Sequence, residues 1–145
     1  MMNILVVDDD ADMAELLRDV LSFDGHSVSI AGDGVQALRL TRERHPDVVF
    51  CDIGLPGEMN GLDVSRAIRG EDNLEQPKLV ALSGYSDPED LRASAHAGFD
   101  LHLVKPVDIK VIKDIVSTST GKLESRNQTF NRNCNKASTQ SLASM

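Results

Sequence analysis

The chain has 145 residues and a formal net charge of −8, from 15 Lys and Arg against 23 Asp and Glu. That length suits one domain that can bury its own core. The acidic balance argues against a broad nucleic-acid contact, which needs clustered basic side chains. Aromatic residues make up only 3% of the chain, so the core must be built from Val, Leu, Ile and Ala.

The N-terminus carries no signal for secretion. Residues 1–4 lack a basic segment followed by a long apolar stretch, and no apolar run is long enough to span a bilayer. Cys51 and Cys134 lie far apart and show neither a disulfide framework nor a metal-ligand spacing. We therefore expect a cytoplasmic protein in which Cys51 is a small buried apolar residue.

The first two strand–helix pairs occupy residues 4–46. An apolar run at residues 4–7 precedes a helical pattern in which apolar residues recur at positions 13, 16, 17, 20 and 21. Asp10 or Asp12 can cap this helix, and Gly25 ends it. A weaker alternating run at residues 27–31 leads to Asp33-Gly34, which begins a second helix that closes near residue 45.

The third run, residues 48–51, is continuously apolar, as expected for a strand covered on both faces. A Gly-rich loop at residues 54–61 separates it from a third helix, which is marked by Val64, Ala67 and Ile68.

The last two pairs begin with runs at residues 79–82 and 101–104. Asp87-Pro88 gives the fourth helix a capped start with proline at its first position, and Gly98 ends it. Apolar residues at positions 112, 115 and 116 mark a fifth helix. Five strand–helix pairs in strict alternation predict an α/β fold with a doubly wound parallel sheet and helices on both faces.

The composition changes at about residue 118. Residues 118–145 are rich in Ser, Thr, Asn, Gln and Lys, with few large apolar side chains. Such a segment buries too little surface to offset the entropy of ordering. We predict one domain at residues 1–117 and a disordered polar tail at 118–145.

Five chemically active side chains stand at the ends of the apolar runs. They are Asp8, Asp9, Asp52, Ser83 and Lys105. Ligands of open parallel sheets bind outside the carboxyl ends of the strands, so these side chains should meet at one edge. Three carboxylates, a hydroxyl and an ammonium suit a divalent cation and a phosphoryl group.

Each residue type has a chemical reason to be there. Adjacent carboxylates such as Asp8 and Asp9 repel each other and demand a counterion or a raised pKa; Mg²⁺ prefers such hard oxygen ligands. Asp52 can act as a nucleophile that forms an acyl phosphate, and Lys105 suits a phosphoryl oxygen. The plainer interpretations are helix capping by the Asp run, a loop cap at Asp52, a turn at Ser83 and a surface lysine.

The motifs at these positions resemble the response-regulator receiver domain of two-component signalling, over residues 3 to about 116. The matching segments are Leu5-Val6-Val7-Asp8-Asp9, Asp52-Ile53-Gly54-Leu55-Pro56, Ala81-Leu82-Ser83-Gly84 and Val104-Lys105-Pro106. The segments at 52–56 and 98–107 are most similar to receivers attached to hybrid sensor kinases. The resemblance implies a flavodoxin-like (βα)5 sheet with strand order 2-1-3-4-5.

The resemblance also implies a role for each site residue. Asp52 would be the phosphoacceptor and Asp9 a direct Mg²⁺ ligand, while Asp8 would bind the ion directly or through water. The backbone carbonyl of Gly54 would complete the protein ligands. Ser83 would hydrogen-bond the phosphoryl group and shift its loop. Lys105 would contact the phosphate, with a cis peptide before Pro106.

From the short chain and its polar tail we predict a stand-alone regulator in a phosphorelay. The phosphoryl group would come from a sensor or hybrid histidine kinase or a phosphotransfer protein. The regulator would signal by contacting a downstream protein through the face of helix four, strand five and helix five, with transient homodimers through the same face. We expect no direct nucleic-acid contact, no membrane insertion and no enzyme activity beyond self-phosphorylation and slow autodephosphorylation.

Two positions depart from the common pattern. The loop at residues 56–61 carries one residue more than usual. His102 stands where many receivers have Tyr or Phe as a rotameric switch. We favour a partly exposed strand histidine there, with a pH-sensitive switch as the alternative.

Other functions fit less well. A phosphatase would use the D-x-D spacing of Asp8 and Asp10, but Ala11-Asp12 follows where such enzymes need Gly and a hydroxyl. A flavin carrier needs a Ser- and Thr-rich loop after the first strand, and this loop is acidic. A calcium loop lacks its turn Gly, because Met13 stands there. A receiver-like binding module that is never phosphorylated stays open as an alternative.

Overall fold

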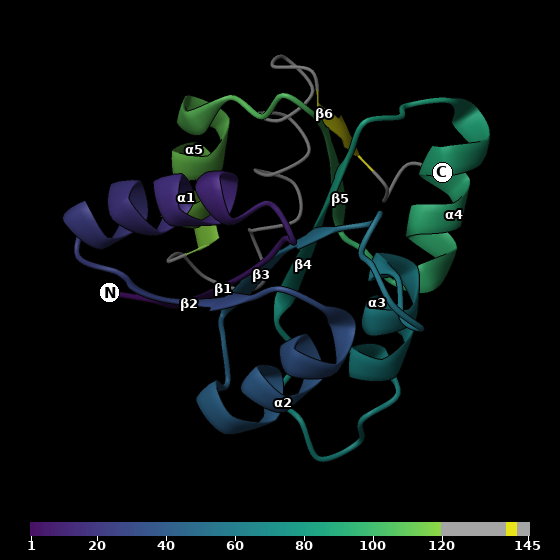
Figure 1. The fold of residues 1–145 in the computed structure, drawn as a ribbon, viewed down its shortest axis with the longest axis horizontal. Helices are drawn as coiled ribbons and strands as arrows, with labels where there is room; N and C mark the ends of the chain where they lie inside the picture. The colour runs from purple at the N-terminus through teal and green to yellow at the C-terminus, as the bar shows by residue number, and fades with distance from the viewer. Residues whose placement is uncertain (120–138, 142–145) are drawn as a thin grey trace.

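A computed structural model describes residues 1–119 and 139–141, and its ribbon alternates strands and helices as predicted (Figure 1). The elements in chain order are β1 (Asn3–Val7), α1 (Ala11–Phe23), β2 (Ser27–Ala31), α2 (Gly34–Arg44), β3 (Val48–Asp52), α3 (Gly61–Arg69), β4 (Lys78–Ser83), α4 (Pro88–Ala97), β5 (Leu101–Val104), α5 (Ile109–Ser119) and β6 (Thr139–Ser141).

The strands form one sheet in the order β2-β1-β3-β4-β5-β6. The first five are parallel, which confirms the predicted flavodoxin-like order 2-1-3-4-5. Helices α1 and α5 cover one face, and α2, α3 and α4 cover the other (Figure 1). Every strand from β1 to β5 therefore points its carboxyl end toward the same edge of the sheet.

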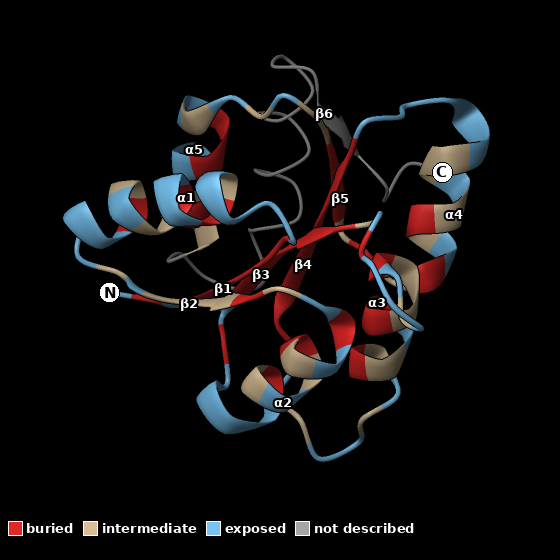
Figure 2. Ribbon diagram, viewed as in Figure 1, coloured by how far each residue is buried: buried red, intermediate tan, exposed pale blue. Residues whose placement is uncertain are grey.

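Two apolar clusters hold the helices on the sheet. Alternate residues of a strand face opposite sides, so Ile4 and Val6 of β1 pack with Leu17 of α1, while Leu5 and Val7 join the cluster of the opposite face. All of β3 is buried, as the continuous apolar run predicted (Figure 2). Cys51 is among these buried residues, as expected, and carries a free thiol.

Polar side chains cap the starts of four helices, including α5, where Asp108 accepts from the Lys110 N–H at 2.9 Å. Asp10 accepts from the backbone N–H groups of Asp12 and Met13 at 3.1 and 3.3 Å, and Asp33 and Asn60 cap α2 and α3 in the same way. Helix α4 begins at the predicted Asp87-Pro88 pair. Asp87 holds the N-cap position without a side-chain cap hydrogen bond, and Pro88 begins the helix through its fixed φ and missing N–H.

The C-terminal region differs from the expectation in two places. Helix α5 runs to Ser119, two residues beyond the predicted boundary. Within the predicted tail, Thr139–Ser141 pairs antiparallel with β5, so that Leu103 lies opposite Thr139; an edge strand presents backbone groups that such a segment can pair with. The rest of the predicted tail, with Cys134, lies outside the described residues.

Candidate functional site

The carboxyl edge of the sheet gathers the predicted side chains. Asp8 directly follows β1, Asp52 ends β3, Ser83 ends β4 and Lys105 directly follows β5. The backbone joins the last two, because the Lys105 N–H donates to the Ser83 carbonyl at 2.7 Å. The parallel topology thus unites residues that are up to 97 positions apart in the chain.

Lys105 binds two of the carboxylates at once. Its Nζ lies 3.2 Å from Asp8 Oδ2 and 3.1 Å from Asp52 Oδ2, and its side chain is 28% exposed. Burial lowers the pKa of Lys105, but the hydrogen bond to Asp52 and the charges of both carboxylates outweigh it and leave that pKa above its ordinary value. The ammonium therefore keeps its proton and is not a surface lysine turned to solvent.

Asp8 is a buried carboxylate whose charge is only partly compensated. Burial raises its pKa; the Asp10 N–H, which donates to Oδ1 at 2.9 Å, and the Lys105 ammonium oppose that rise, and the charge of Asp52 adds to it. The helix-capping interpretation fails for Asp8 and Asp9, because Asp10 alone is the side-chain cap of α1. The desolvated carboxylate calls for a further cation.

A metal ion fits this edge. Ligand atoms of Asp8, Asp9 and Asp52 all lie within 4.8 Å of one another. Three carboxylates and the Lys105 ammonium leave a formal charge of −2, which a divalent cation would neutralise. Asp9 is exposed and would close the site from the solvent side. Hard oxygen donors of this kind suit Mg²⁺.

Gly54 lies directly beside this cluster. Its N–H donates to Asp52 Oδ1 at 3.0 Å, so the turn after β3 fixes the carboxylate that Lys105 holds from the other side. Its predicted role as a carbonyl ligand stays a prediction. The predicted cis peptide between Lys105 and Pro106 is present.

The sequence matches the family described as "Response regulator receiver domain" over residues 4–117. The chain belongs to the response-regulator receiver family. It is 43% identical over 103 residues to the DNA-binding response regulator MtrA of Mycobacterium tuberculosis, across 71% of this chain and 43% of that protein. The receiver thus spans less than half the length of the curated relatives it matches first.

Two solved structures support the receiver fold. A putative response regulator from Chloroflexus aurantiacus is 28% identical with a TM-score of 0.75, covering 83% of this chain and 98% of that one. The signal receiver domain of a histidine kinase from Syntrophus aciditrophicus is 28% identical with a TM-score of 0.74, covering 82% and 89%.

The receiver site depends on one residue that sequence reasoning missed. Gly61, the first residue of α3, packs against the backbone at the end of β3, and a Cβ on it would lie 2.3 Å from the Asp52 carbonyl oxygen. Its N–H donates to the Ile53 carbonyl at 2.8 Å. The Asn60–Asp63 capping box marks this helix start in the sequence, but the close approach to Asp52 is a tertiary contact.

His102 is not the partly exposed histidine that we favoured. Its ring is 0% exposed because this position of β5 faces α4. Nδ1 lies 2.9 Å from Ser94 Oγ, and Nε2 lies 2.9 Å from the Tyr85 carbonyl oxygen. Burial lowers the pKa of His102 although the Tyr85 carbonyl and the charge of Asp90 act to raise it, so the ring is neutral at pH 7.

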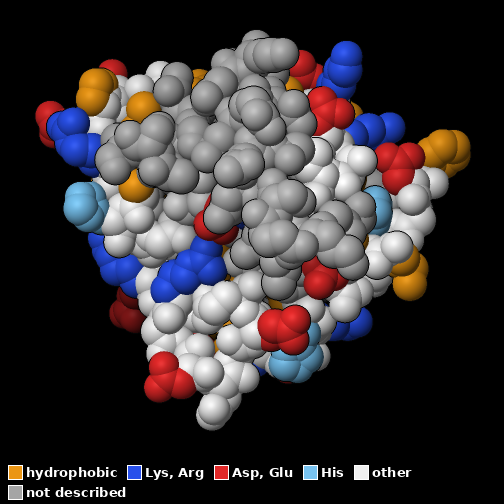
Figure 3. All heavy atoms as spheres, turned by 180° about the vertical axis from the view of Figure 1, so that it is seen from behind, with side chains coloured by type: hydrophobic (Ala, Val, Ile, Leu, Met, Phe, Trp, Pro, Cys, Tyr) orange, Lys and Arg blue, Asp and Glu red, His pale blue; other side chains and the backbone are white. Residues whose placement is uncertain are grey.

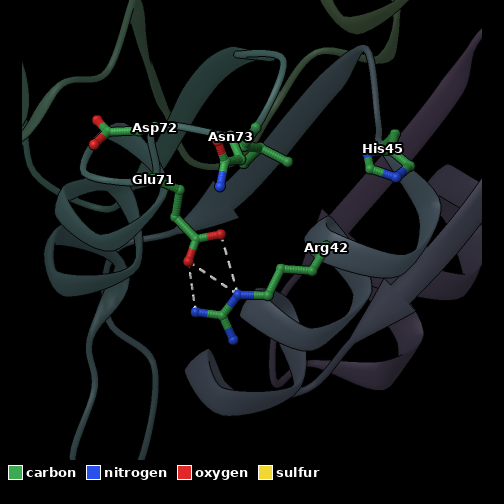
Figure 4. A pocket seen from close by; sticks show the side chains of 6 residues that line it. Arg42, His45, Glu71, Asp72 and Asn73 are labelled. Carbon is green, nitrogen blue, oxygen red and sulfur yellow. Dashed lines mark hydrogen bonds and ion pairs between the residues drawn. The ribbon is translucent and has the colours of Figure 1, made fainter.

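A pocket of about 300 Å³ lies elsewhere, at the end of α2 and the loop before β4 (Figure 4). Arg42 and Glu71 face each other in it, with Nη2 and Oε2 2.8 Å apart. Helix α2 leads into the start of β3, so this pocket lies at the amino edge of the sheet, away from the acidic cluster. Arg42 and Glu71 satisfy each other's charge there, and a solvent-accessible ion pair of this kind contributes little to stability.

Proposed function

We propose that Asp52 accepts a phosphoryl group from a phosphorylated histidine of a sensor kinase or phosphotransfer protein. The observation that carries the proposal is the Lys105 ammonium held between Asp8 and Asp52 beside a third carboxylate. A cation placed there neutralises charge on the incoming group, and phosphoryl transfer needs positioning and neutralisation more than covalent machinery.

The chain's own residues supply the rest of the chemistry. An Asp52 carboxylate oxygen attacks phosphorus as the bond to the donor breaks, the donor keeps the electron pair, and an acyl phosphate forms. Lys105 and the Ser83 hydroxyl contact the phosphoryl oxygens. Mg²⁺, held by Asp8, Asp9 and Asp52 with the Gly54 carbonyl, would supply further neutralisation of charge.

The partners follow from the same proposal. A histidine kinase supplies the phosphoryl group, and a solved receiver from a histidine kinase is among the similar structures. The product is the modified receiver itself, so we propose no enzyme activity on a separate substrate. A downstream protein would bind the face of α4, β5 and α5, where transient homodimers could also form; stand-alone action stays a prediction.

Two further expectations concern nucleic-acid contact and cellular location. Acidic and basic side chains are interspersed on the described surface that is visible from behind (Figure 3), which supports a protein partner rather than direct nucleic-acid contact. No helix in the described part of the chain could cross a membrane. We place the protein in the cytoplasm, where ATP-dependent kinases act.

The test is incubation with acetyl phosphate and Mg²⁺, followed by intact mass. We expect the mass of one phosphoryl group on the wild type, none on Asp52→Asn, and slower gain on Asp8→Asn. Full labelling of Asp52→Asn with loss in Asp8→Asn would favour the phosphatase alternative. A wild type that gains no mass with acetyl phosphate or a phosphorylated kinase would favour the binding module.

A further inference from the structure

A chain of three hydrogen bonds links the phosphoryl site to helix α4. The Tyr85 N–H donates to Ser83 Oγ at 3.0 Å. The Tyr85 carbonyl oxygen lies 2.9 Å from His102 Nε2, and His102 Nδ1 lies 2.9 Å from Ser94 Oγ. Through this chain the end of β4, the following loop, β5 and α4 contact one another.

The direction of each bond follows from the atoms involved. A carbonyl oxygen carries no proton, so His102 Nε2 must be the donor to Tyr85. In the neutral ring the other nitrogen then has only a lone pair, and the Ser94 hydroxyl must donate to Nδ1. His102 is therefore held as a single tautomer by two partners, one on each side of the ring.

The side chain of Tyr85 contributes little to holding its loop. The Tyr85 side chain is 71% exposed, so it does not anchor the loop by packing. Within the described part of the chain, a Cβ added to the neighbouring Gly84 would meet nothing within 4 Å. His102 and Ser94, by contrast, are both fully buried. The buried His102 ring is thus the rigid part of this series of hydrogen bonds, and it holds the Tyr85 backbone in place.

This arrangement fixes how Ser83 can act. A hydroxyl has one proton and two lone pairs, and the Tyr85 N–H occupies a lone pair of Ser83 Oγ. The Ser83 proton then stays available for donation into the acidic edge. If the Tyr85 backbone moved away, the hydroxyl would lose the bond that orients it.

We propose that His102 is a positioning residue for Ser83 in the phosphorylation of Asp52: the buried ring holds the Tyr85 carbonyl, and the Tyr85 N–H orients the Ser83 hydroxyl toward the phosphoryl group. The inference rests on the proposed function. In this role His102 stays buried and acts on the reaction site only through the Tyr85 backbone.

The test is a double-mutant cycle on the rate of labelling by acetyl phosphate with Mg²⁺. His102→Phe keeps a buried ring but loses both hydrogen bonds, and we expect roughly tenfold slower labelling, less than the loss when an oxyanion donor is removed outright. His102→Gln keeps a donor for Tyr85 and should recover most of the rate. His96→Gln, at an exposed histidine of α4, is the matched control and should match the wild type.

The decisive comparison is made in a Ser83→Ala background. A residue that acts through Ser83 has nothing to act on there, so His102→Phe should cause no further loss. An equal loss in both backgrounds, or an unchanged rate for His102→Phe alone, would overturn the inference. A wild type that is never labelled would instead overturn the proposed function and this inference with it.

A second measurement needs no variant. The ¹⁵N shifts of His102 in the wild type should show a protonated Nε2 and an unprotonated Nδ1. A protonated Nδ1 in the neutral ring would be incompatible with donation to the Tyr85 carbonyl and would refute the proposal, even if His102→Phe did not fold.

Discussion

The change in stability on Gly61→Ala should differ in sign depending on whether helix propensity or backbone overlap dominates at this position. If Gly61 were an ordinary first residue of α3, Gly61→Ala would stabilise the protein by up to about 1 kcal/mol through helix propensity. The structure indicates the opposite. The new Cβ would lie 2.3 Å from the Asp52 carbonyl oxygen and 2.6 Å from Ile53 Cα, both atoms of the backbone.

The cost can be worked from that overlap. Backbone atoms cannot rotate away as a flexible side chain can, so the end of β3 or the start of α3 must shift. Overpacking of this kind costs about 1–3 kcal/mol, and we expect a net loss of about 2 kcal/mol in the free energy of unfolding. Since the displaced backbone belongs to Asp52, phosphorylation should slow as well.

Urea denaturation measures the stability, and acetyl phosphate labelling measures the function. Gly32→Ala is the matched control, because a Cβ there meets none of the described residues within 4 Å and its backbone needs no positive φ. We expect its stability to stay within about 0.5 kcal/mol of the wild type. A Gly61→Ala protein as stable as the wild type, or more so, would refute the argument from close approach.

Further predictions concern Asp8, the metal and the core. The folded-state pKa of Asp8 is raised above its ordinary value of 3.8. The stability gained from protonated Asp8 is therefore fully present below pH 3.8 and is lost as pH rises through the folded-state pKa. In EDTA the wild type should therefore lose stability relative to Asp8→Asn as pH rises toward 7, while the control Asp12→Asn follows the wild type; parallel curves for wild type and Asp8→Asn would contradict this. Mg²⁺ at 100 times its Kd should restore about 2.7 kcal/mol to the wild type by linkage and less to Asp8→Asn, measured by urea denaturation. Leu17→Ala should cost about 2–5 kcal/mol in the same assay, because Leu17 is fully buried, whereas Leu16→Ala, at a residue that is 49% exposed, should cost far less; equal losses would contradict the assignment of the α1 face.

Local patterns predicted the strands well where they were bounded by polar residues or glycine. The runs at residues 27–31 and 101–104 match β2 and β5. The meeting of Asp8, Asp52 and Lys105 followed from parallel topology alone, because carboxyl ends share one edge. The capping of α1 by Asp10 could also be read from the sequence.

Contacts between distant segments were harder to predict. Strand alternation placed His102 on a face but did not reveal that Ser94 and the Tyr85 carbonyl would enclose its ring. Likewise, nothing near Gly61 in the sequence shows that the Asp52 carbonyl lies against it. The pairing of Thr139–Ser141 with β5 depends on an open strand edge, which only the assembled sheet displays.

Chemical trapping of the acyl phosphate tests the central claim most directly. The protein is labelled with acetyl phosphate and Mg²⁺ and reduced with borohydride, which converts an aspartyl phosphate into homoserine. Peptide mass spectrometry then locates the changed residue. We expect homoserine at position 52 alone, and trapping at position 8 or 9 with Asp52 unchanged would contradict phosphorylation of Asp52.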